Sequence, residues 1–380
     1  MHILIAPNAF KNSLTAGVAA LAIEKGLQQS NLNCTTQCFP IADGGDGTAA
    51  IIIQQLQGKL VSMQVHDPLG RIITASFGLI EDGKTAVIEM ADASGLRLLK
   101  ADELNPLRAS SYGTGEMVKK ALELGVNKIL IAMGGSATVD GATGILSALD
   151  IKFLAGDSRE LNNLPESLIE LKSIDHSGID PRILNCEVIV LCDVDNMLLG
   201  DNGSAAVFGP QKGADANAVK KLDTALAKFN DVTLQQFGKN MATAKYGGTA
   251  GGAAAGLYAH INASLVNGID YLLQLTNFDQ SLQKSDLLIT GEGSIDEQTL
   301  NGKGPFGAAS RAKAKGIPII GLAGKIPAAN NQKLNEYFNV LMAIGNEPSD
   351  IETALARTEE NLIRTAKGIG DMLAIGKPSV

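Results

Sequence analysis

The stretch Asp286–Phe306, DLLITGEGSIDEQTLNGKGPF, limits the possible folds of this chain more than any other. Residues 286–290 are short and almost wholly apolar, which predicts a buried strand of a parallel sheet. Gly291-Glu292-Gly293 should end that strand, and a polar loop with Asp296 and Lys303 follows. Because ligands of open α/β sheets bind outside the carboxyl ends of strands, we expect this loop to belong to a site. A solvated loop whose glycines only make turns is the alternative.

The same unit of strand, polar loop and helix begins the chain. His2–Ala6 predicts a first buried strand and Ala16–Gln29 an amphipathic helix, so Lys11 falls in the loop between them. Any surface loop can carry a lysine, however. A second strand, predicted over Cys34–Ile41, ends at Asp43-Gly44-Gly45-Asp46-Gly47. There carboxylates and backbone N–H groups could converge on a phosphate and a divalent cation, or form a plain turn.

The middle of the chain has a different texture. Leu60–Val65, Ile72–Leu79 and Thr85–Glu89 are consecutive strand candidates joined by turn residues, which predicts an antiparallel meander. This change predicts a discontinuous domain of residues 1–60 plus 284–380 that carries an inserted α/β domain of residues 61–283. The fold class is α/β, with a Rossmann/flavodoxin-like parallel sheet in the discontinuous domain.

Two strand ends within the inserted segment also carry polar groups. Gly134-Gly135-Ser136-Ala137-Thr138 follows a predicted strand and opens a helix, which is typical of an anion cradle. Cys192-Asp193-Val194-Asp195 offers two carboxylates that could both turn toward one Mg²⁺, or could form a polar strand exit. The chain contains no G-x-x-x-x-G-K-[ST] motif and no G-x-G-x-x-G between a strand and a helix. These absences argue against P-loop and dinucleotide-binding folds.

Composition excludes several classes of function. The formal net charge of −8 is spread along the chain, so neither nucleic acid nor an anionic membrane is an expected partner. No apolar run reaches the ~18 residues that a membrane span needs. The four cysteines form no C-x-x-C pair and do not cluster with the four histidines, which argues against zinc and favours a reducing, cytoplasmic compartment. Because the first apolar strand follows Met1-His2 directly, no signal peptide is expected.

Nine short motifs occur in order along nearly the whole chain: Ala6-Pro7 with Phe10-Lys11, Ala42–Thr48, Asp67–Arg71, Ala93–Leu96, Ser111–Glu116, Gly134–Thr138, Cys192–Val194, Phe208–Ala214, and Gly291–Gly293 with Asp296. Through these motifs the chain resembles the type I family of bacterial glycerate kinases. One segment departs from the family pattern, because Asp195–Leu199 stands where Asn-Pro-Leu is usual.

The resemblance implies an ATP-dependent, Mg²⁺-requiring kinase that phosphorylates D-glycerate, commonly on the 2-hydroxyl to give 2-phospho-D-glycerate. It also implies a two-domain α/β fold with the active site in the cleft. Phosphorylation of the 3-hydroxyl or of another small hydroxy acid is the alternative. A non-catalytic regulatory protein that binds a sugar acid is the alternative from another class, and homo-oligomerisation stays open.

Carboxylates in glycine loops, a few loop lysines and hydroxyl-rich turns suit phosphoryl transfer. Asp296 is the expected general base, although Asp43 and Asp46 could equally take that role, or could hold Mg²⁺ with Asp193. Lys11 would neutralise the charge of the transferring phosphoryl group. The planar guanidinium of Arg71 would hold the glycerate carboxylate. The expected roles are catalytic for Asp296, Lys11 and Asp43; substrate-binding for Arg71, Ser94 and Asp46; nucleotide-binding for Gly134, Gly135, Ser136, Thr138, Gly291 and Gly293; and metal-binding for Asp193 and Glu292.

Overall fold

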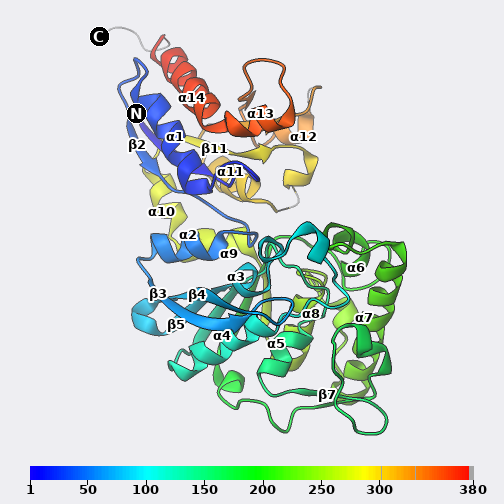
Figure 1. Cartoon of the computed structure of the whole chain (residues 1–380). Helices are drawn as coiled ribbons and strands as arrows, with labels where there is room; N and C mark the ends of the chain where they lie inside the picture. Colours follow the sequence, from blue (N-terminus) through cyan, green and yellow to red (C-terminus); the bar gives the residue numbers. More distant parts are fainter. Residues whose placement is uncertain (301, 330, 376–380) are drawn as a thin grey trace. The chain divides into compact units, whose positions relative to one another are not determined.

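The computed structural model describes residues 1–300, 302–329 and 331–375. The chain forms two compact units (Figure 1). We call Met1–Asp43 with Ile269–Val380 the terminal unit, and Gly44–Gly268 the middle unit. The domain boundaries expected from the sequence, 1–60 with 284–380 for one domain and 61–283 for the other, remain a prediction. The contacts divide the chain at 43/44 and 268/269, because the helix Thr48–Gln55 packs on strands of the middle unit.

The terminal unit is built on a five-stranded sheet whose neighbouring strands are all parallel, in the order β13-β12-β11-β1-β2. Read from the other edge, this is the flavodoxin-like order 2-1-3-4-5, as the fold class predicted. The strands are β1 (His2–Pro7), β2 (Thr35–Cys38), β11 (Leu287–Ser294), β12 (Ile319–Lys325) and β13 (Val340–Ala343).

Helices cover the sheet of the terminal unit. The helices α1 and α14 pack against each other, in one core cluster with Ile3, Ile5 and Ile289 of the sheet. The helix α11 packs against β1, β11 and β12. The helices are α1 (Ala16–Gln28), α9 (Gly268–Leu275), α10 (Phe278–Gln283), α11 (Gly304–Ala314), α12 (Gln332–Asn335), α13 (Ile351–Ala356) and α14 (Thr358–Ile375).

The middle unit holds a mixed six-stranded sheet in the order β10-β9-β6-β5-β4-β3. The pairs β3–β4 and β4–β5 are antiparallel, which confirms the predicted meander, and the other pairs are parallel. The strands are β3 (Lys59–His66), β4 (Ile72–Ile80), β5 (Thr85–Glu89), β6 (Lys128–Ala132), β9 (Glu187–Cys192) and β10 (Ser264–Asn267), with β7 (Lys152–Leu154) and β8 (Ser173–Asp175) paired separately.

The largest core cluster lies in the middle unit and joins sheet residues such as Ile131 and Val190 to the surrounding helices. Figure 1 shows these helices around the sheet, from α2 in blue through cyan and green to α8 in yellow-green. They are α2 (Thr48–Gln55), α3 (Met90–Ser94), α4 (Tyr112–Glu123), α5 (Thr143–Ala148), α6 (Ser204–Phe208), α7 (Ala216–Phe237) and α8 (Ala253–Ile261).

Two predicted elements differ from the structure. The strand expected over residues 286–290 continues to Ser294, because β11 stays paired with β12 up to the Ser294–Lys325 position. Gly291 permits this, since a Cβ there would lie 2.2 Å from the carbonyl oxygen of Leu322. The helix expected to open at Gly134–Thr138 begins only at Thr143, as α5, so these residues form a loop. Near the end of the described chain, α13 and α14 are two separate helices. At the junction the Thr358 hydroxyl bonds to the carbonyls of Ala354 and Leu355, a contact that competes with the helical ladder.

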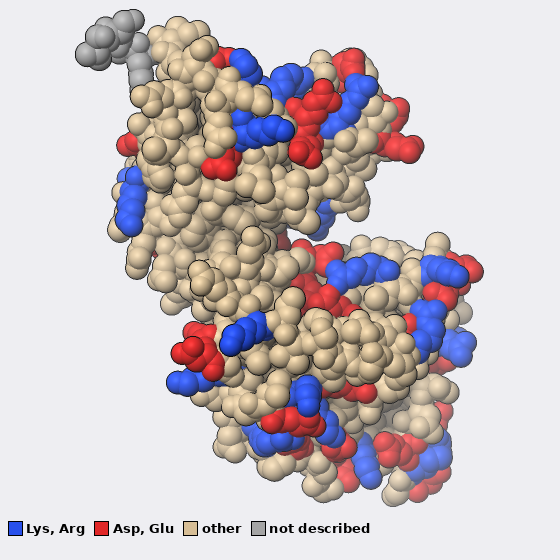
Figure 2. Space-filling model, turned by 60° about the vertical axis from the view of Figure 1, so that its left-hand side comes forward, with Lys and Arg blue, Asp and Glu red and all other residues tan. Residues whose placement is uncertain are grey.

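Charged residues are interspersed on the face shown in Figure 2, in keeping with the scattered charges of the sequence. Among residues 1–300, 302–329 and 331–375, no helix combines the length and apolarity that crossing a bilayer requires.

Candidate functional site

In the terminal unit the strand order reverses between β1 and β11, and ligands of open α/β sheets bind at the carboxyl ends of the strands at such a point. The loop after β1 is tied to the end of β11, because Asn8 N donates to Gly291 O at 2.8 Å. A Cβ on Gly293 would lie 3.6 Å from Lys11 N, an ordinary contact distance. Lys11 and Gly291–Gly293, predicted from opposite ends of the sequence, therefore lie side by side.

Glu292 is the buried acid of this edge, with a relative exposure of 7%. Thr299 Oγ1 donates to Glu292 Oε1 at 2.9 Å. Burial raises the pKa of Glu292 from 4.5 to about 7, against the lowering effects of Lys303 and Lys11, while the charge of Asp43 raises it further. The result is a carboxyl group that changes its charge near neutral pH, as catalytic acids and bases commonly do.

Asp43 is fixed at the same edge by the start of α11. Its Oδ2 accepts from Asn8 Nδ2 at 3.1 Å and from Gly304 N at 3.3 Å. Gly304 is the first residue of α11, so this N–H has no partner within the helix, and the helix dipole favours a carboxylate there. A Cβ on Gly304 would lie 2.9 Å from the side-chain nitrogen of Asn8, so a larger residue there would displace the Asn8 side chain that bonds to Asp43.

Asp296 has a local structural partner. Its Oδ1 accepts from Gln298 N at 2.9 Å, an Asx turn at the start of the short 3₁₀ helix Glu297–Leu300. Thr299 Oγ1 also accepts from Asp296 N at 3.2 Å. Thr299 thereby folds the loop back onto Glu292. This geometry explains Asp296 as a loop-shaping residue without requiring a catalytic role.

Two glycine loops of the middle unit are in direct backbone contact. Met133 N and Gly134 N both donate to Gly44 O at 3.2 Å. A Cβ on Gly134 would lie 2.1 Å from Asp46 N and 2.2 Å from Gly45 C, so only glycine fits there. The contact brings Asp46 next to Gly135, and it joins two motifs that lie about ninety residues apart in the sequence.

Asp46 belongs to a cluster of charged groups that sequence reasoning missed. Arg97 Nη1 lies 3.1 Å from Asp46 Oδ1, and Arg97 Nη2 pairs with Asp92. Glu89 is buried and accepts from Gly47 N at 3.1 Å and from Ala49 N at 2.8 Å. Burial raises the pKa of Glu89 to about 8, and these two backbone hydrogen bonds oppose the rise.

Lys212 lies behind the predicted cradle Gly134–Thr138 and was also missed, although the motif Phe208–Ala214 contains it. Its Nζ donates to Ser136 Oγ at 2.9 Å and to Thr138 O at 2.6 Å. Burial lowers the pKa of Lys212 from 10.5 to about 7, and the charges of Asp140 and Asp193 oppose that effect. The sequence signal was a lysine between glycines in a loop, which does not reveal burial.

Ser94 is fully buried, and its hydroxyl is hydrogen bonded to Thr114 Oγ1 at 2.7 Å. Its carbonyl accepts from Ala137 N at 2.8 Å, which fixes the cradle from behind. The structure therefore favours a supporting role for Ser94 over the expected contact with substrate.

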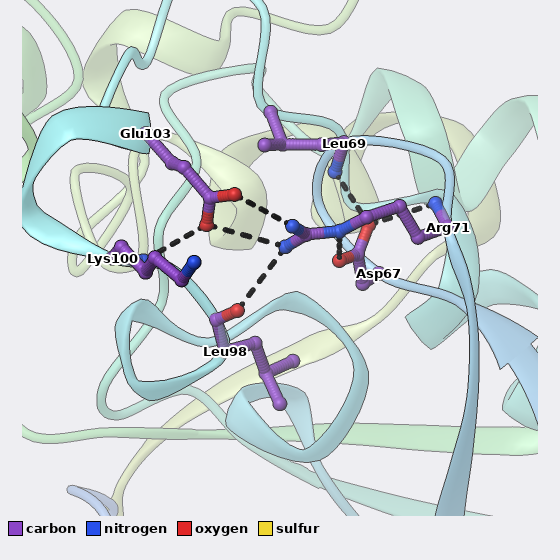
Figure 3. Close-up of polar contacts among 6 residues, drawn as sticks. All are labelled: Asp67, Leu69, Arg71, Leu98, Lys100 and Glu103. Atoms are coloured by element: carbon purple, nitrogen blue, oxygen red, sulfur yellow. Dashed lines mark hydrogen bonds and ion pairs between the residues drawn. The ribbon is translucent and has the colours of Figure 1, made fainter.

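Arg71 is already engaged by two carboxylates, as Figure 3 shows. Its Nε donates to Asp67 Oδ2 at 2.5 Å, its Nη1 to Glu103 Oε1 at 2.7 Å, and its Nη2 to Leu98 O at 3.3 Å. Every nitrogen of the guanidinium group is engaged, so a substrate carboxylate would have to displace Glu103. The contacts instead identify Arg71 as a residue that joins two loops of the middle unit.

The two expected metal ligands lie in different units, Asp193 after β9 in the middle unit and Glu292 in the terminal unit. Within the described ranges, no group of three or more His, Cys, Asp or Glu side chains could hold a metal ion. Mg²⁺ bound with a nucleotide commonly uses one or two protein carboxylates and takes its other ligands from phosphates and water. A single carboxylate such as Asp193 fits that pattern.

Comparison with known proteins gives consistent matches over the full length. The family described as "Glycerate kinase family" matches residues 3–374. The glycerate kinase of Bacillus subtilis is 40% identical over 377 residues, which cover 99% of both chains. The glycerate 2-kinase of Escherichia coli is 40% identical over 380 residues, again 99% of both. A crystal structure provisionally assigned as glycerate kinase 2, from Salmonella typhimurium, is 38% identical, covers 99% of both chains and superimposes with a TM-score of 0.84.

Proposed function

Because the chain belongs to the glycerate kinase family, whose members are phosphotransferases with an alcohol acceptor, we propose that it transfers the γ-phosphoryl group of ATP to the 2-hydroxyl of D-glycerate. The products are 2-phospho-D-glycerate and ADP. One observation carries the proposal: a relative named glycerate 2-kinase is 40% identical over 99% of both chains. A full-length match to named kinases favours an enzyme over the alternative of a binding protein.

We assign the proton-accepting role to Glu292, in place of the metal-binding role expected from the sequence. A general base works best when its pKa lies near the operating pH, and burial raises the pKa of Glu292 to about 7. In the proposed step the hydroxyl oxygen of glycerate attacks the γ-phosphorus while its proton passes to Glu292. The bond from the γ-phosphorus to the bridging oxygen of ADP breaks at the same time.

The lysines beside Glu292 fit the electrostatic part of this reaction. Lys11 and Lys303 both lower the pKa of Glu292 through their charges, so both cations lie within range of the reacting groups. Phosphoryl transfer depends chiefly on such positioned charges, since the protein forms no covalent bond with the phosphoryl group. Asp43, held at the start of α11, would orient the hydroxyl that reacts.

ATP and Mg²⁺ are the proposed cofactors. Bound Mg²⁺ would neutralise phosphate charge, and Asp193 is the carboxylate that would help to hold it. Within the cradle Gly134–Thr138, the N–H groups of Gly135 and Ser136 and the Ser136 hydroxyl would bind phosphate oxygens, since Gly134 N already donates to Gly44 O and Ala137 N to Ser94 O.

A coupled assay tests the proposed reaction. Release of ADP is followed with Mg-ATP and D-glycerate, and the product is offered to enolase alone or to phosphoglycerate mutase plus enolase. Consumption by enolase alone supports the 2-hydroxyl. A requirement for the mutase would move the phosphate to the 3-hydroxyl, and ADP release only with another hydroxy acid would change the substrate. The absence of ADP release with every acid tried would overturn the proposed activity.

A further inference from the structure

The cradle Gly134–Thr138 is backed by a lysine that solvent barely reaches. Lys212 has a relative exposure of 2% and extends from the 3₁₀ helix Pro210–Lys212. Among the described residues, its hydrogen-bond acceptors are Ser136 Oγ and Thr138 O, and both are uncharged. Burying an ammonium group without a directly bonded carboxylate is unfavourable, so a role beyond filling space is expected.

The nearest acidic groups act on Lys212 through their charge. Asp140 accepts hydrogen bonds from Ser111 N, Ser111 Oγ, Ala142 N and Gly144 N, so its oxygens hold the start of α5. The charges of Asp140 and Asp193 raise the pKa of Lys212, but burial has the larger, opposite effect. Near neutral pH Lys212 is therefore only partly charged, and a bound anion would favour its ammonium form.

The lysine determines which way the hydroxyl of Ser136 can donate. Since Ser136 Oγ accepts a hydrogen bond from Nζ of Lys212, its own O–H must point to another acceptor. Thr138 Oγ1 is completely buried, yet it has no hydrogen-bond partner in the described part of the chain. Within the same ranges, the backbone N–H groups of Gly135 and Ser136 also donate to no protein acceptor. The Ser136 hydroxyl and the N–H groups of Gly135 and Ser136 are therefore available at this turn, beside the buried Thr138 hydroxyl, which suits an anion.

Phosphate fits this set better than a carboxylate does. A terminal phosphate offers three acceptor oxygens and carries more negative charge than a carboxylate, which has two oxygens. The nearby cluster contains the acids Asp46 and Asp92 and one cation, Arg97, while the third acid, Glu89, is mostly protonated at neutral pH because burial raises its pKa to about 8. A further positive charge is needed if this region is to hold a phosphate.

We propose that Lys212 is the buried cation of the cradle and acts as a positioning residue: it holds Ser136 so that the serine hydroxyl donates to a nucleotide phosphate, and it supplies positive charge behind that phosphate. This inference rests on the proposed function, because it identifies the cradle as part of the ATP site. It gives the motif Phe208–Ala214 a role.

The test measures nucleotide affinity apart from turnover. Lys212→Met keeps the length of the side chain and removes its charge, whereas Lys221→Met makes the same change at an exposed position of α7 and is the control. Titration calorimetry with Mg-ATP and no glycerate should give a Kd at least ~10-fold weaker for Lys212→Met, a typical cost for losing a hydrogen bond to a charged group. The Kd of Lys221→Met and the KM for D-glycerate of both variants should stay within about 2-fold of the wild type.

A double-mutant cycle tests whether Lys212 acts through Ser136. Ser136→Ala should weaken Mg-ATP binding roughly 3- to 10-fold, and the double variant should bind no more than about 2-fold more weakly than Lys212→Met. If the fold-changes in the Kd for Mg-ATP of the two single variants multiply in the double variant, the two residues act independently and the positioning role of Lys212 is overturned. If Lys212→Met does not fold, as judged by its thermal unfolding, a normal Kd in Ser136→Ala would overturn the proposal by itself.

Other results contradict the inference separately from the proposed function. A wild-type Kd for Mg-ATP in a folded but less stable Lys212→Met would mean that the lysine only braces the turn. A raised KM for glycerate with an unchanged Kd for Mg-ATP would mean that the cradle holds a carboxylate. By contrast, a wild type that binds Mg-ATP but phosphorylates no hydroxy acid would refute the proposed reaction and leave the cradle intact.

Discussion

Gly134→Ala should separate the two glycine loops of the middle unit. The added Cβ would lie 2.1 Å from Asp46 N and 2.2 Å from Gly45 C, both of them backbone atoms. Non-bonded heavy atoms are comfortable at roughly 3.5 Å, so the loops must part by about 1 Å. Overpacking of this kind costs about 1–3 kcal/mol, which lowers the melting temperature of a domain of this size by several degrees.

The same displacement should reduce catalysis more than stability. A misplacement of about 1 Å at a positioned group can cost ~10²-fold in rate, and here it would move Asp46 away from Gly135 and Ser136. The assays are kcat from ADP release and thermal unfolding by circular dichroism. Gly156→Ala is the matched control, because no described atom lies within 4 Å of its Cβ position, and it should change neither quantity appreciably. Wild-type kcat and melting temperature in Gly134→Ala would refute the contact between the loops.

Three further predictions concern single side chains. Glu292→Gln should lower kcat about 10²-fold, the usual effect of losing a general base, whereas a larger loss in Asp296→Asn would return that role to Asp296. Burial lowers the pKa of His260 from 6.5 to about 3. Between these two pH values His260 is therefore protonated in the unfolded chain and neutral in the folded chain. The free energy of unfolding should therefore decrease as the pH is lowered, by roughly 2 kcal/mol between pH 6.5 and pH 5. Urea titrations at several pH values should show that this free energy depends less steeply on pH in His260→Gln than in the wild type. An unchanged slope would refute the burial of a neutral His260. Arg71→Met should leave the KM for glycerate within about 3-fold, because Asp67 and Glu103 already hold the guanidinium; a tenfold rise at constant kcat would restore its substrate role.

Local patterns in the sequence predicted the architecture well. Apolar runs of five or six residues that end at glycine loops specify parallel strands, and turn residues between alternating strands specify a meander. Those patterns located both sheets and the loops at their strand ends. They misplaced the end of β11 because Gly291 resembles a strand terminator, while its close contact with Leu322 requires a glycine within a strand.

The individual roles within the candidate site depended on contacts that the sequence does not reveal. Lys212 and Arg71 both stand in loops next to glycine, yet one is buried behind hydroxyl groups and the other is paired with Asp67 and Glu103. Similarly, Glu292 and Asp296 share one loop, but burial raises the pKa of Glu292 while Asp296 completes a turn.

The sequence by itself determined the alternation of strands and helices and the loops that carry the polar groups, because period and turn chemistry act over a few residues. The tertiary structure alone decided that Gly44–Asp46 meets Gly134, that Glu292 is shielded from water and that Lys212 lies beneath Ser136. Desolvation and charge pairing set the protonation of these groups. Both depend on residues brought together from distant parts of the chain, so no local pattern encodes them.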